Sequence, residues 1–144
     1  MTIKQALKQK ARLVKSINER VVRIEKDNSV IEGAIRSYNP QTELQSLLEE
    51  TNQLIELKTA IHRANTEVYD KIFRLSELKN LVKTLKKMDT QEGNVSRRGY
   101  GESMLLNYNV VISASTRDKM VKSYEDEIDA LQDELDTYNA TKTL

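Results

Sequence analysis

A stretch of 48 residues from Gln41 to Met88 contains no glycine and no proline, and it constrains the fold more than any other feature. Its leucines, isoleucines and valines recur three and four residues apart, which indicates a helix rather than a strand. One unbroken helix of that length would extend roughly 70 Å, whereas a compact chain of this size has a radius of gyration of about 14 Å. The sequence therefore predicts that the segment folds back midway or that several copies of the chain share a core.

An apolar row with seven-residue spacing runs along this segment and predicts a coiled-coil seam. The row consists of Leu47, Leu54, Ile61, Val68, Leu75 and Val82. A second apolar row, from Leu44 to Met88, widens the stripe, so we expect the helix to contact at least two partners. Polar residues 62–66 interrupt the pattern. Asn65 either fixes the register of the seam as a buried amide, or it marks a break or a lining of polar groups that faces a ligand.

The segment before Pro40 also carries a helical pattern. An apolar series in steps of three and four begins at Ile3 and continues to Ile31, which predicts a first helix over about 2–35. Asn39 is a plausible N-cap for the following helix, with Pro40 at its first position.

The last helix has a start signal of its own. Ser115 followed by Asp118 resembles a capping box and predicts a helix over about 116–140. Together with the helical segment 41–88, these helices predict a single all-α domain, 1–144. The sequence does not decide whether the middle segment is broken near Asn65. We expect its long amphipathic helices to form an antiparallel coiled coil or helical bundle.

The helical pattern stops over 89–115, where three of the four glycines lie. A connection of this length usually has a function or is disordered. We expect one long irregular loop or arm. Its apolar run, 104–112, is rich enough in β-branched and aromatic residues to form a short strand or an extended arm.

This loop also carries the best functional signal. Neighbouring arginines offer planar groups that suit phosphate or carboxylate, and a tyrosine between two glycines is able to stack on a base. The candidate ligand-binding residues of the loop and of the polar island are Arg97, Arg98, Tyr100, Ser103, Tyr108, Arg63 and Asn65. They would suit a small anionic ligand held between subunits. The same arginines would equally pair with the acidic last helix of a neighbouring protomer, and the sequence leaves both alternatives open.

Charge is unevenly distributed along a chain whose net charge is +1. Residues 2–27 hold eight Lys or Arg against three Asp or Glu, and residues 117–139 hold three against eight. Opposite signs predict that these two helices are neighbours. Because the positive charge is scattered on a nearly neutral chain, we expect no nucleic-acid binding.

The residue types limit the chemistry. His62 is the only histidine and there is no cysteine, so we expect no catalytic residue, no metal and no cofactor. Charged residues make up 31% and aromatic residues 5%, which favours long helices with a thin core and therefore a homo-oligomer. No window reaches the roughly 18 apolar residues of a membrane span, and a cysteine-free chain suits a reducing compartment. We expect a cytoplasmic protein without a membrane partner.

Two short motifs carry a resemblance. Residues 61–65 read Ile-His-Arg-Ala-Asn, and residues 139–144 read Asn-Ala-Thr-Lys-Thr-Leu. They resemble the Ile-Asn-Arg-Thr-Asn segment and the Asn-Trp-x-Thr-x-Leu tail of the septicolysin-like family, small helical bacterial and phage proteins of unsettled function. Ala140 stands where that family usually has tryptophan, and the glycine-containing loop after the Asn-Arg-Thr-Asn segment is missing. The resemblance, that of a distant member, implies a helical homo-oligomer and leaves activity open.

The sequence thus leads to two hypotheses of function. The first is a non-enzymatic, homo-oligomeric helical binding protein that holds or sequesters a small anionic nucleotide-like ligand in pockets between subunits. The alternative is a structural coiled-coil scaffold without a small-molecule ligand. If the first is right, replacing Arg97 and Arg98 by alanine abolishes ligand-induced thermal stabilisation and leaves the oligomer intact.

Overall fold

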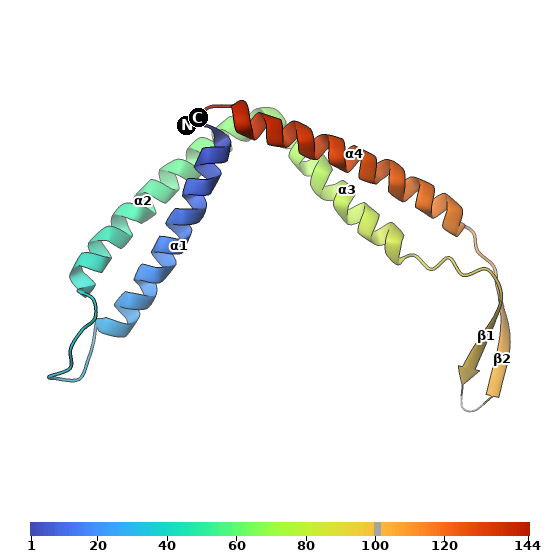
Figure 1. Cartoon of the computed structure of the whole chain (residues 1–144), viewed down its shortest axis with the longest axis horizontal. Coiled ribbons are helices and arrows are strands. Elements are labelled where there is room, and N and C mark those ends of the chain that lie inside the picture. The colour runs from blue at the N-terminus through green and yellow to red at the C-terminus, as the bar shows by residue number, and fades with distance from the viewer. Residues whose placement is uncertain (100–101) are drawn as a thin grey trace. The chain divides into compact units, whose positions relative to one another are not determined.

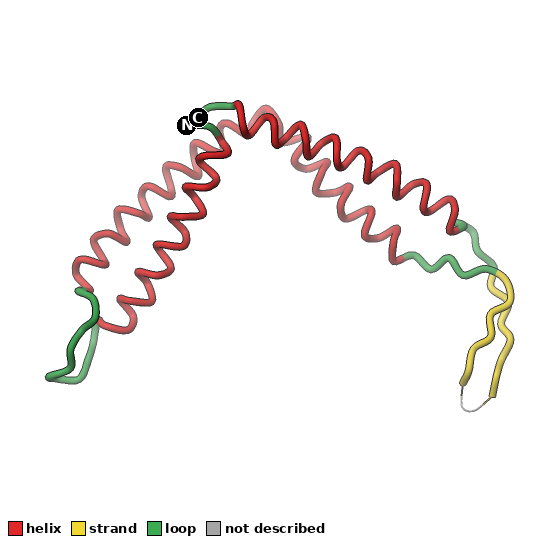
Figure 2. The backbone as a smooth tube through the Cα atoms, in the orientation of Figure 1, coloured by secondary structure: helices red, strands yellow, loops and turns green. Residues whose placement is uncertain are grey.

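The computed structural model describes residues 1–99 and 102–144, with side chains described for 1–96 and 104–144. The chain is mostly helical, as the all-α prediction requires, with one small two-stranded sheet in addition (Figures 1 and 2). In chain order the elements are α1 (Ile3–Asp27), α2 (Pro40–Ala64), the 3₁₀ turn η1 (Asn65–Val68), α3 (Tyr69–Lys87), β1 (Gly93–Gly99), β2 (Glu102–Tyr108) and α4 (Ala114–Thr141). They form two compact units, one of Met1–Tyr69 with Asp136–Leu144 and the other of Asp70–Leu135.

In the first unit, α1 and α2 run side by side in opposite directions (Figure 1). The Thr2 hydroxyl accepts a hydrogen bond from the Gln5 N–H, and the Gln5 side chain accepts one from the Thr2 N–H, which completes a capping box at the start of α1. Asn39 caps α2 and Pro40 is its first residue, as the sequence predicts. The buried apolar residues of this unit are few: Ile3, Ala6, Leu13, Ile61 and Val68.

The end of the chain packs in the same unit. The Tyr138 hydroxyl donates to the Ala64 carbonyl at 2.6 Å, and the Lys142 ammonium lies 2.8 Å from the Glu67 carboxylate. The hydrogen bond from Lys142 lowers the pKa of Glu67, and Glu67 in turn raises the pKa of Lys142. A β-bridge between Thr2 and Thr143 places the two ends of the chain together (Figure 1).

The long middle segment breaks at η1. The Asn65 backbone N–H bonds to the carbonyls of Ile61 and Arg63, and its side-chain oxygen is buried without a hydrogen-bond partner among the described atoms. Beyond the break, the Tyr69 hydroxyl bonds to the His62 ring and to the His62 carbonyl. The structure therefore shows the break that the sequence left open at this polar island.

In the second unit, α3 and α4 lie side by side and are joined by ion pairs (Figure 1). The pairs are Lys71 with Glu134, Arg74 with Glu127, and Lys86 with Glu125. The carboxylates of Glu134 and Glu127 raise the pKa of Lys71 and Arg74 respectively through hydrogen bonds. These carboxylates of the acidic last helix thus form ion pairs with α3. The charge pattern had predicted that they would pair with the basic first helix.

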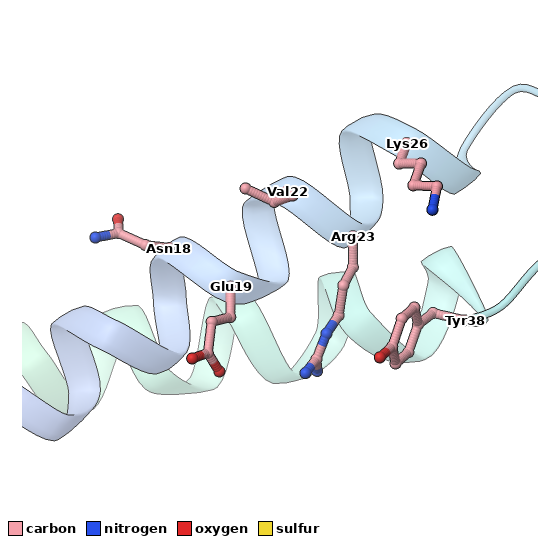
Figure 3. Close-up of a pocket in the computed structure, with 6 residues that line it drawn as sticks. All are labelled: Asn18, Glu19, Val22, Arg23, Lys26 and Tyr38. Carbon is pink, nitrogen blue, oxygen red and sulfur yellow. The ribbon is translucent and has the colours of Figure 1, made fainter.

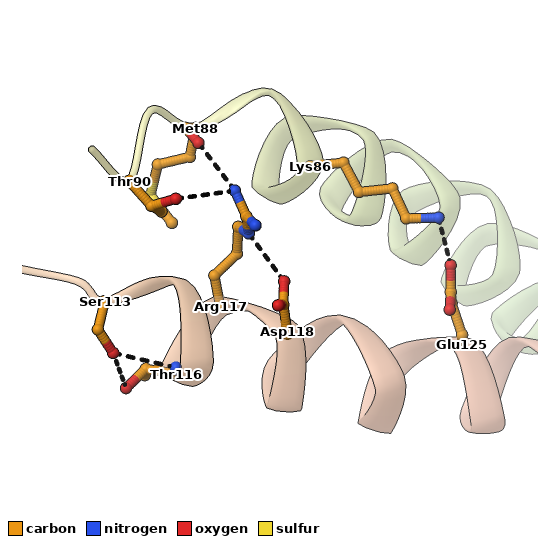
Figure 4. Close-up of polar contacts among 8 residues, drawn as sticks. All are labelled: Lys86, Met88, Thr90, Ser113, Thr116, Arg117, Asp118 and Glu125. Atoms are coloured by element: carbon orange, nitrogen blue, oxygen red, sulfur yellow. Dashed lines mark hydrogen bonds and ion pairs between the residues drawn. The ribbon is translucent and has the colours of Figure 1, made fainter. Parts of the chain in front are cut away.

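At the far ends of α3 and α4, the chain forms a β-hairpin. β1 and β2 pair antiparallel from Gly93 opposite Tyr108 to Gly99 opposite Glu102. Arg117, near the start of α4, donates to the Met88 carbonyl and to the Thr90 hydroxyl, both at 3.2 Å (Figure 4). It thereby ties the chain that enters the hairpin to the helix that follows it.

Three predicted boundaries need correction. The first helix ends at Asp27 instead of near residue 35, because Asp27 anchors the following loop. The irregular loop predicted over 89–115 contains a hairpin, whose two strands satisfy each other's backbone groups. The last helix begins at Ala114, since the hydroxyl of Ser113, rather than of Ser115, accepts the Thr116 N–H (Figure 4). Among the described helices, none has the length and apolarity needed to cross a bilayer.

Candidate functional site

A groove of about 450 Å³ lies beside the last turns of α1, and we call it the Tyr38 groove (Figure 3). It is lined by Asn18, Glu19, Val22, Arg23, Lys26 and Tyr38. Five of these residues come from successive turns of α1, and the tyrosine comes from the loop that leads into α2. The volume falls within the range of about 300–1,000 Å³ that is usual for small-molecule sites.

Asp27 places the tyrosine in this groove. Its carboxylate accepts the Tyr38 N–H at 2.8 Å, and its backbone carbonyl accepts the Arg36 Nε at 2.7 Å. Asp27 is only 4% exposed, so this carboxylate belongs to the folded structure and not to the solvated surface. The loop is thus fastened at two points to the end of α1, and it brings the ring back over the preceding turn of the helix.

The Arg23 guanidinium lies over the Tyr38 ring, 4.4 Å from the ring centroid (Figure 3). This is the geometry of a cation–π contact, in which a planar guanidinium stacks on the negative face of an aromatic ring. Arg23 also lies 3.6 Å from the Glu43 carboxylate of α2. Because both contacts hold the same side chain, the guanidinium is oriented before any ligand arrives.

Behind Arg23 lies a group of charged residues that joins the two helices, and we call it the Arg20 cluster: Ser16, Arg20, Arg23, Glu43 and Glu50. Arg20 donates to Glu43 at 2.9 Å and to Glu50 at 3.1 Å, and the Ser16 hydroxyl donates to Glu50 at 2.9 Å. The hydrogen bond from Arg20 lowers the pKa of the Glu50 carboxyl, against the opposing effect of burial, and Glu50 likewise raises the pKa of Arg20. Glu43 is shared between the two arginines, at 2.9 Å from Arg20 and 3.6 Å from Arg23.

Lys26 supplies the second cation of the groove. It makes no ion pair or hydrogen bond within the described part of the chain, unlike Arg23. Val22, which is 62% exposed, adds an apolar side chain to the lining. The groove therefore combines a stacked aromatic ring, an oriented guanidinium, an apolar side chain, the Glu19 carboxylate and an ammonium group without an ion-pair partner among the described residues.

The predicted site residues do not form this groove. Arg63, at the end of α2, and Asn65, at the start of η1, belong to the first unit, and Tyr108, at the end of β2, belongs to the second. The side chains of Arg97, Arg98 and Ser103 lie outside the described residues, and so does the whole of Tyr100.

Tyr108 does line a hollow, of about 350 Å³, where the hairpin meets its two connecting segments. The other residues of this hollow are Met88, Asp89, Gln91, Asn109, Val110, Val111 and Ile112. Its described lining contains one acidic group, Asp89, and no cationic side chain, so it lacks the ion-pairing groups of the Tyr38 groove. The anion site that the sequence suggested for Tyr108 stays a prediction.

The Tyr38 groove was not predicted from the sequence, because the sequence identifies Tyr38 only as part of a turn before Pro40. A partial signal was present: Asn18, Val22 and Lys26 stand at four-residue spacing, which places them on one side of α1, off the apolar seam. The spacing does not give the path of the loop, which depends on the hydrogen bonds of Asp27 to Arg36 and Tyr38.

Among the described residues, no three His, Asp or Glu side chains gather as a metal site would require. Comparisons with known proteins add no further constraint: no family model, no curated protein and no solved structure matches the chain. The resemblance to the septicolysin-like family therefore stays a prediction.

Proposed function

We propose that the chain is a non-enzymatic, homo-oligomeric helical protein that binds and holds a small anionic, nucleotide-like ligand. The observation that carries this proposal is the stack of Arg23 on Tyr38 with the unpaired Lys26 one turn along α1. Relative to the sequence hypothesis, the function is retained and the site moves from the 97–108 region to the Tyr38 groove.

The ligand class follows from the groups in the groove. A flat ring of the ligand would pack against Val22 and the tyrosine, since aromatic rings favour offset or edge-to-face contacts. A phosphate or carboxylate would meet the ammonium of Lys26 and the free edge of the Arg23 guanidinium, which both donate charge-assisted hydrogen bonds. The groove holds no histidine, cysteine or serine, and its one carboxylate, Glu19, lies 3.9 Å from the Lys15 ammonium of the same helix. We therefore propose holding rather than conversion.

Self-association is supported by apolar side chains that the first unit leaves exposed. On α1, Leu7 and Val14 are each 39% exposed, and on α2, Leu48 and Ile55 are 54% and 57% exposed. Each pair is seven residues apart, so each forms a row along its helix, away from the seam between α1 and α2. In an antiparallel pair of helices these two rows fall on the same side, and we propose that coiled-coil packing of this side against other copies forms the oligomer.

The test is thermal stabilisation by a panel of nucleotides and their dephosphorylated nucleosides, with variants of the groove. For any nucleotide that raises the melting temperature, Lys26→Gln should weaken binding about tenfold, as expected for the loss of one charge-assisted contact. Tyr38→Leu should abolish the preference for anions that carry an aromatic ring over anions that do not. Arg12→Gln is the matched control, because Arg12 lies two heptads before Lys26 in the same row of α1 and outside the groove.

A scaffold without a small ligand is the second candidate, and the same exposed apolar rows favour it. This candidate predicts an oligomer whose melting temperature does not change when any anion of the panel is added. Equal stabilisation of wild type and Lys26→Gln by every ligand would count against the groove and in favour of this candidate.

A further inference from the structure

The β-hairpin leaves two sheet edges open. In the described chain its sheet consists of β1 and β2 alone, so the outer side of each strand carries backbone N–H and C=O groups without a ladder partner. A two-stranded hairpin is at best marginally stable in water, and a third strand with an apolar face is the usual remedy. Open edges are templates for pairing with another chain.

The two edges differ in their side chains. β2 contains the consecutive residues Met104, Leu105 and Leu106, which are 57%, 69% and 36% exposed. Its only charged residue, Glu102, stands at its end. The sequence of β1 contains two adjacent arginines, and charged side chains are the means by which natural edge strands discourage pairing. β2 is therefore the edge without protection.

The sequence of β2 is complementary to itself. If two copies of β2 pair antiparallel about Leu105, Met104 of one copy stands opposite Leu106 of the other, and Ser103 stands opposite Asn107. Glu102 falls opposite Tyr108, so no two like charges meet. The same pairing of β1 about Ser96 would gather four arginines near its centre.

This pairing also extends the apolar face of the hairpin. The hairpin register sets Val95 opposite Leu106, and Tyr108 lies two residues further along β2 on the same face. Met104 and Leu106 of a second copy would continue this face across a four-stranded sheet. We propose that the hairpin is a self-association element, in which β2 pairs edge to edge, antiparallel and centred on Leu105, with β2 of a second copy of this chain.

The inference rests on the homo-oligomer part of the proposed function and assigns one of its interfaces. Because the chain contains no cysteine, a single introduced cysteine reports contacts without background. Directly opposite residues of antiparallel strands have Cα atoms about 4.5–5.5 Å apart, which is within the range of about 4.4–6.8 Å that a disulfide spans. Leu105→Cys should therefore form a disulfide-linked dimer on mild oxidation at micromolar concentration.

Two matched variants make the test specific. Ser96 stands opposite Leu105 in the hairpin register. Ser96→Cys therefore probes the same face of the sheet at the same position along the strands, but on the β1 edge. Asn107→Cys probes the same edge two residues from the proposed axis, where the two copies of residue 107 would lie four residues, or about 13 Å, apart along the strands. We expect dimer from Leu105→Cys at least about tenfold faster than from either control, because a paired thiol has an effective concentration near ~1 mM.

Equal rates for the three variants, faster crosslinking of Ser96→Cys, or no crosslinking of Leu105→Cys would each overturn the inference. Circular dichroism would verify that the variants keep the helical content of the wild type. If crosslinking fails while the wild type remains an oligomer, the β2 interface is wrong and the proposed homo-oligomer stands. A monomeric wild type would contradict both.

Discussion

The Arg20 guanidinium reaches across from α1 and donates to the Glu50 carboxylate of α2 at 3.1 Å, with both side chains largely shielded from water, at 22% and 18% exposure. The Arg20 Nε and the second Glu50 oxygen are buried without a partner among the described atoms. A partly buried pair of this kind is costly to break, because the remaining charge loses its compensation. We therefore expect the pair to fix the register of the α1/α2 hairpin more than it adds net stability.

Replacing Glu50 by glutamine tests this role. We expect Glu50→Gln to lower the free energy of unfolding by about 1–3 kcal/mol, the usual cost of losing a hydrogen bond to a charged group. Glu56→Gln, an exposed position on the same helix, should change it by less than about 0.5 kcal/mol. Urea unfolding followed by circular dichroism measures both, and equal effects of the two variants would show that the pair has no special role.

The same carboxylate predicts a pH dependence. Arg20 holds the pKa of Glu50 below its ordinary value in the folded chain, so the unfolded chain binds this proton more readily. The contribution of Glu50 is then fully present above its unfolded pKa of about 4.3 and is lost as the pH falls through the lower folded pKa. The stability difference between wild type and Glu50→Gln should shrink below about pH 4. A difference that stays constant from neutral pH to pH 3 would contradict this.

The contact of Tyr138 with the Ala64 carbonyl predicts a third result. The carbonyl stands where α2 gives way to the 3₁₀ turn, and the tyrosine hydroxyl donates to it at 2.6 Å. Tyr138→Phe removes this donor and should cost about 1 kcal/mol of unfolding free energy. Tyr124→Phe, on the same helix, serves as the control, since the Tyr124 hydroxyl makes no hydrogen bond within the described residues. A thermal melt that ranks the two variants in the opposite order would refute the assignment.

The exposed row of α2 gives a prediction about assembly. Leu48→Glu combined with Ile55→Glu places two charges on the side proposed to face other copies, and it should dissociate the oligomer without unfolding the hairpin, because both side chains are more than half exposed. Gln53→Glu adds a charge to the opposite flank of the helix and should leave assembly unchanged. Sedimentation velocity distinguishes these outcomes, and an unchanged sedimentation coefficient for the double variant would remove the row from the interface.

Much of the helical framework was predictable from the sequence, because it depends on local patterns. In the row of seven-residue spacing, Ile61, Val68, Leu75 and Val82 are all buried, and the cap at Asn39 is confirmed. The first helix was overextended, since Ile31 happens to continue the apolar spacing although it is 86% exposed in the loop.

The hairpin and the groove were less predictable, for a different reason. The run that follows residue 103 suggested a strand. Residues 93–99 contain one β-branched residue, Val95, and no aromatic residue, so strand propensity did not identify them as its partner. The Tyr38 groove likewise depends on the hydrogen bonds of Asp27 to the loop. Patterns along one helix do not reveal contacts of this kind.

Native mass spectrometry of the protein purified from cells tests the central proposal most directly, because it reports stoichiometry and retained ligand together. We predict a defined multiple of the 16.6 kDa chain, with an additional small-molecule mass that is lost from Lys26→Gln and kept in Arg12→Gln. A folded chain that remains at 16.6 kDa at micromolar concentration and carries no extra mass would contradict the proposal.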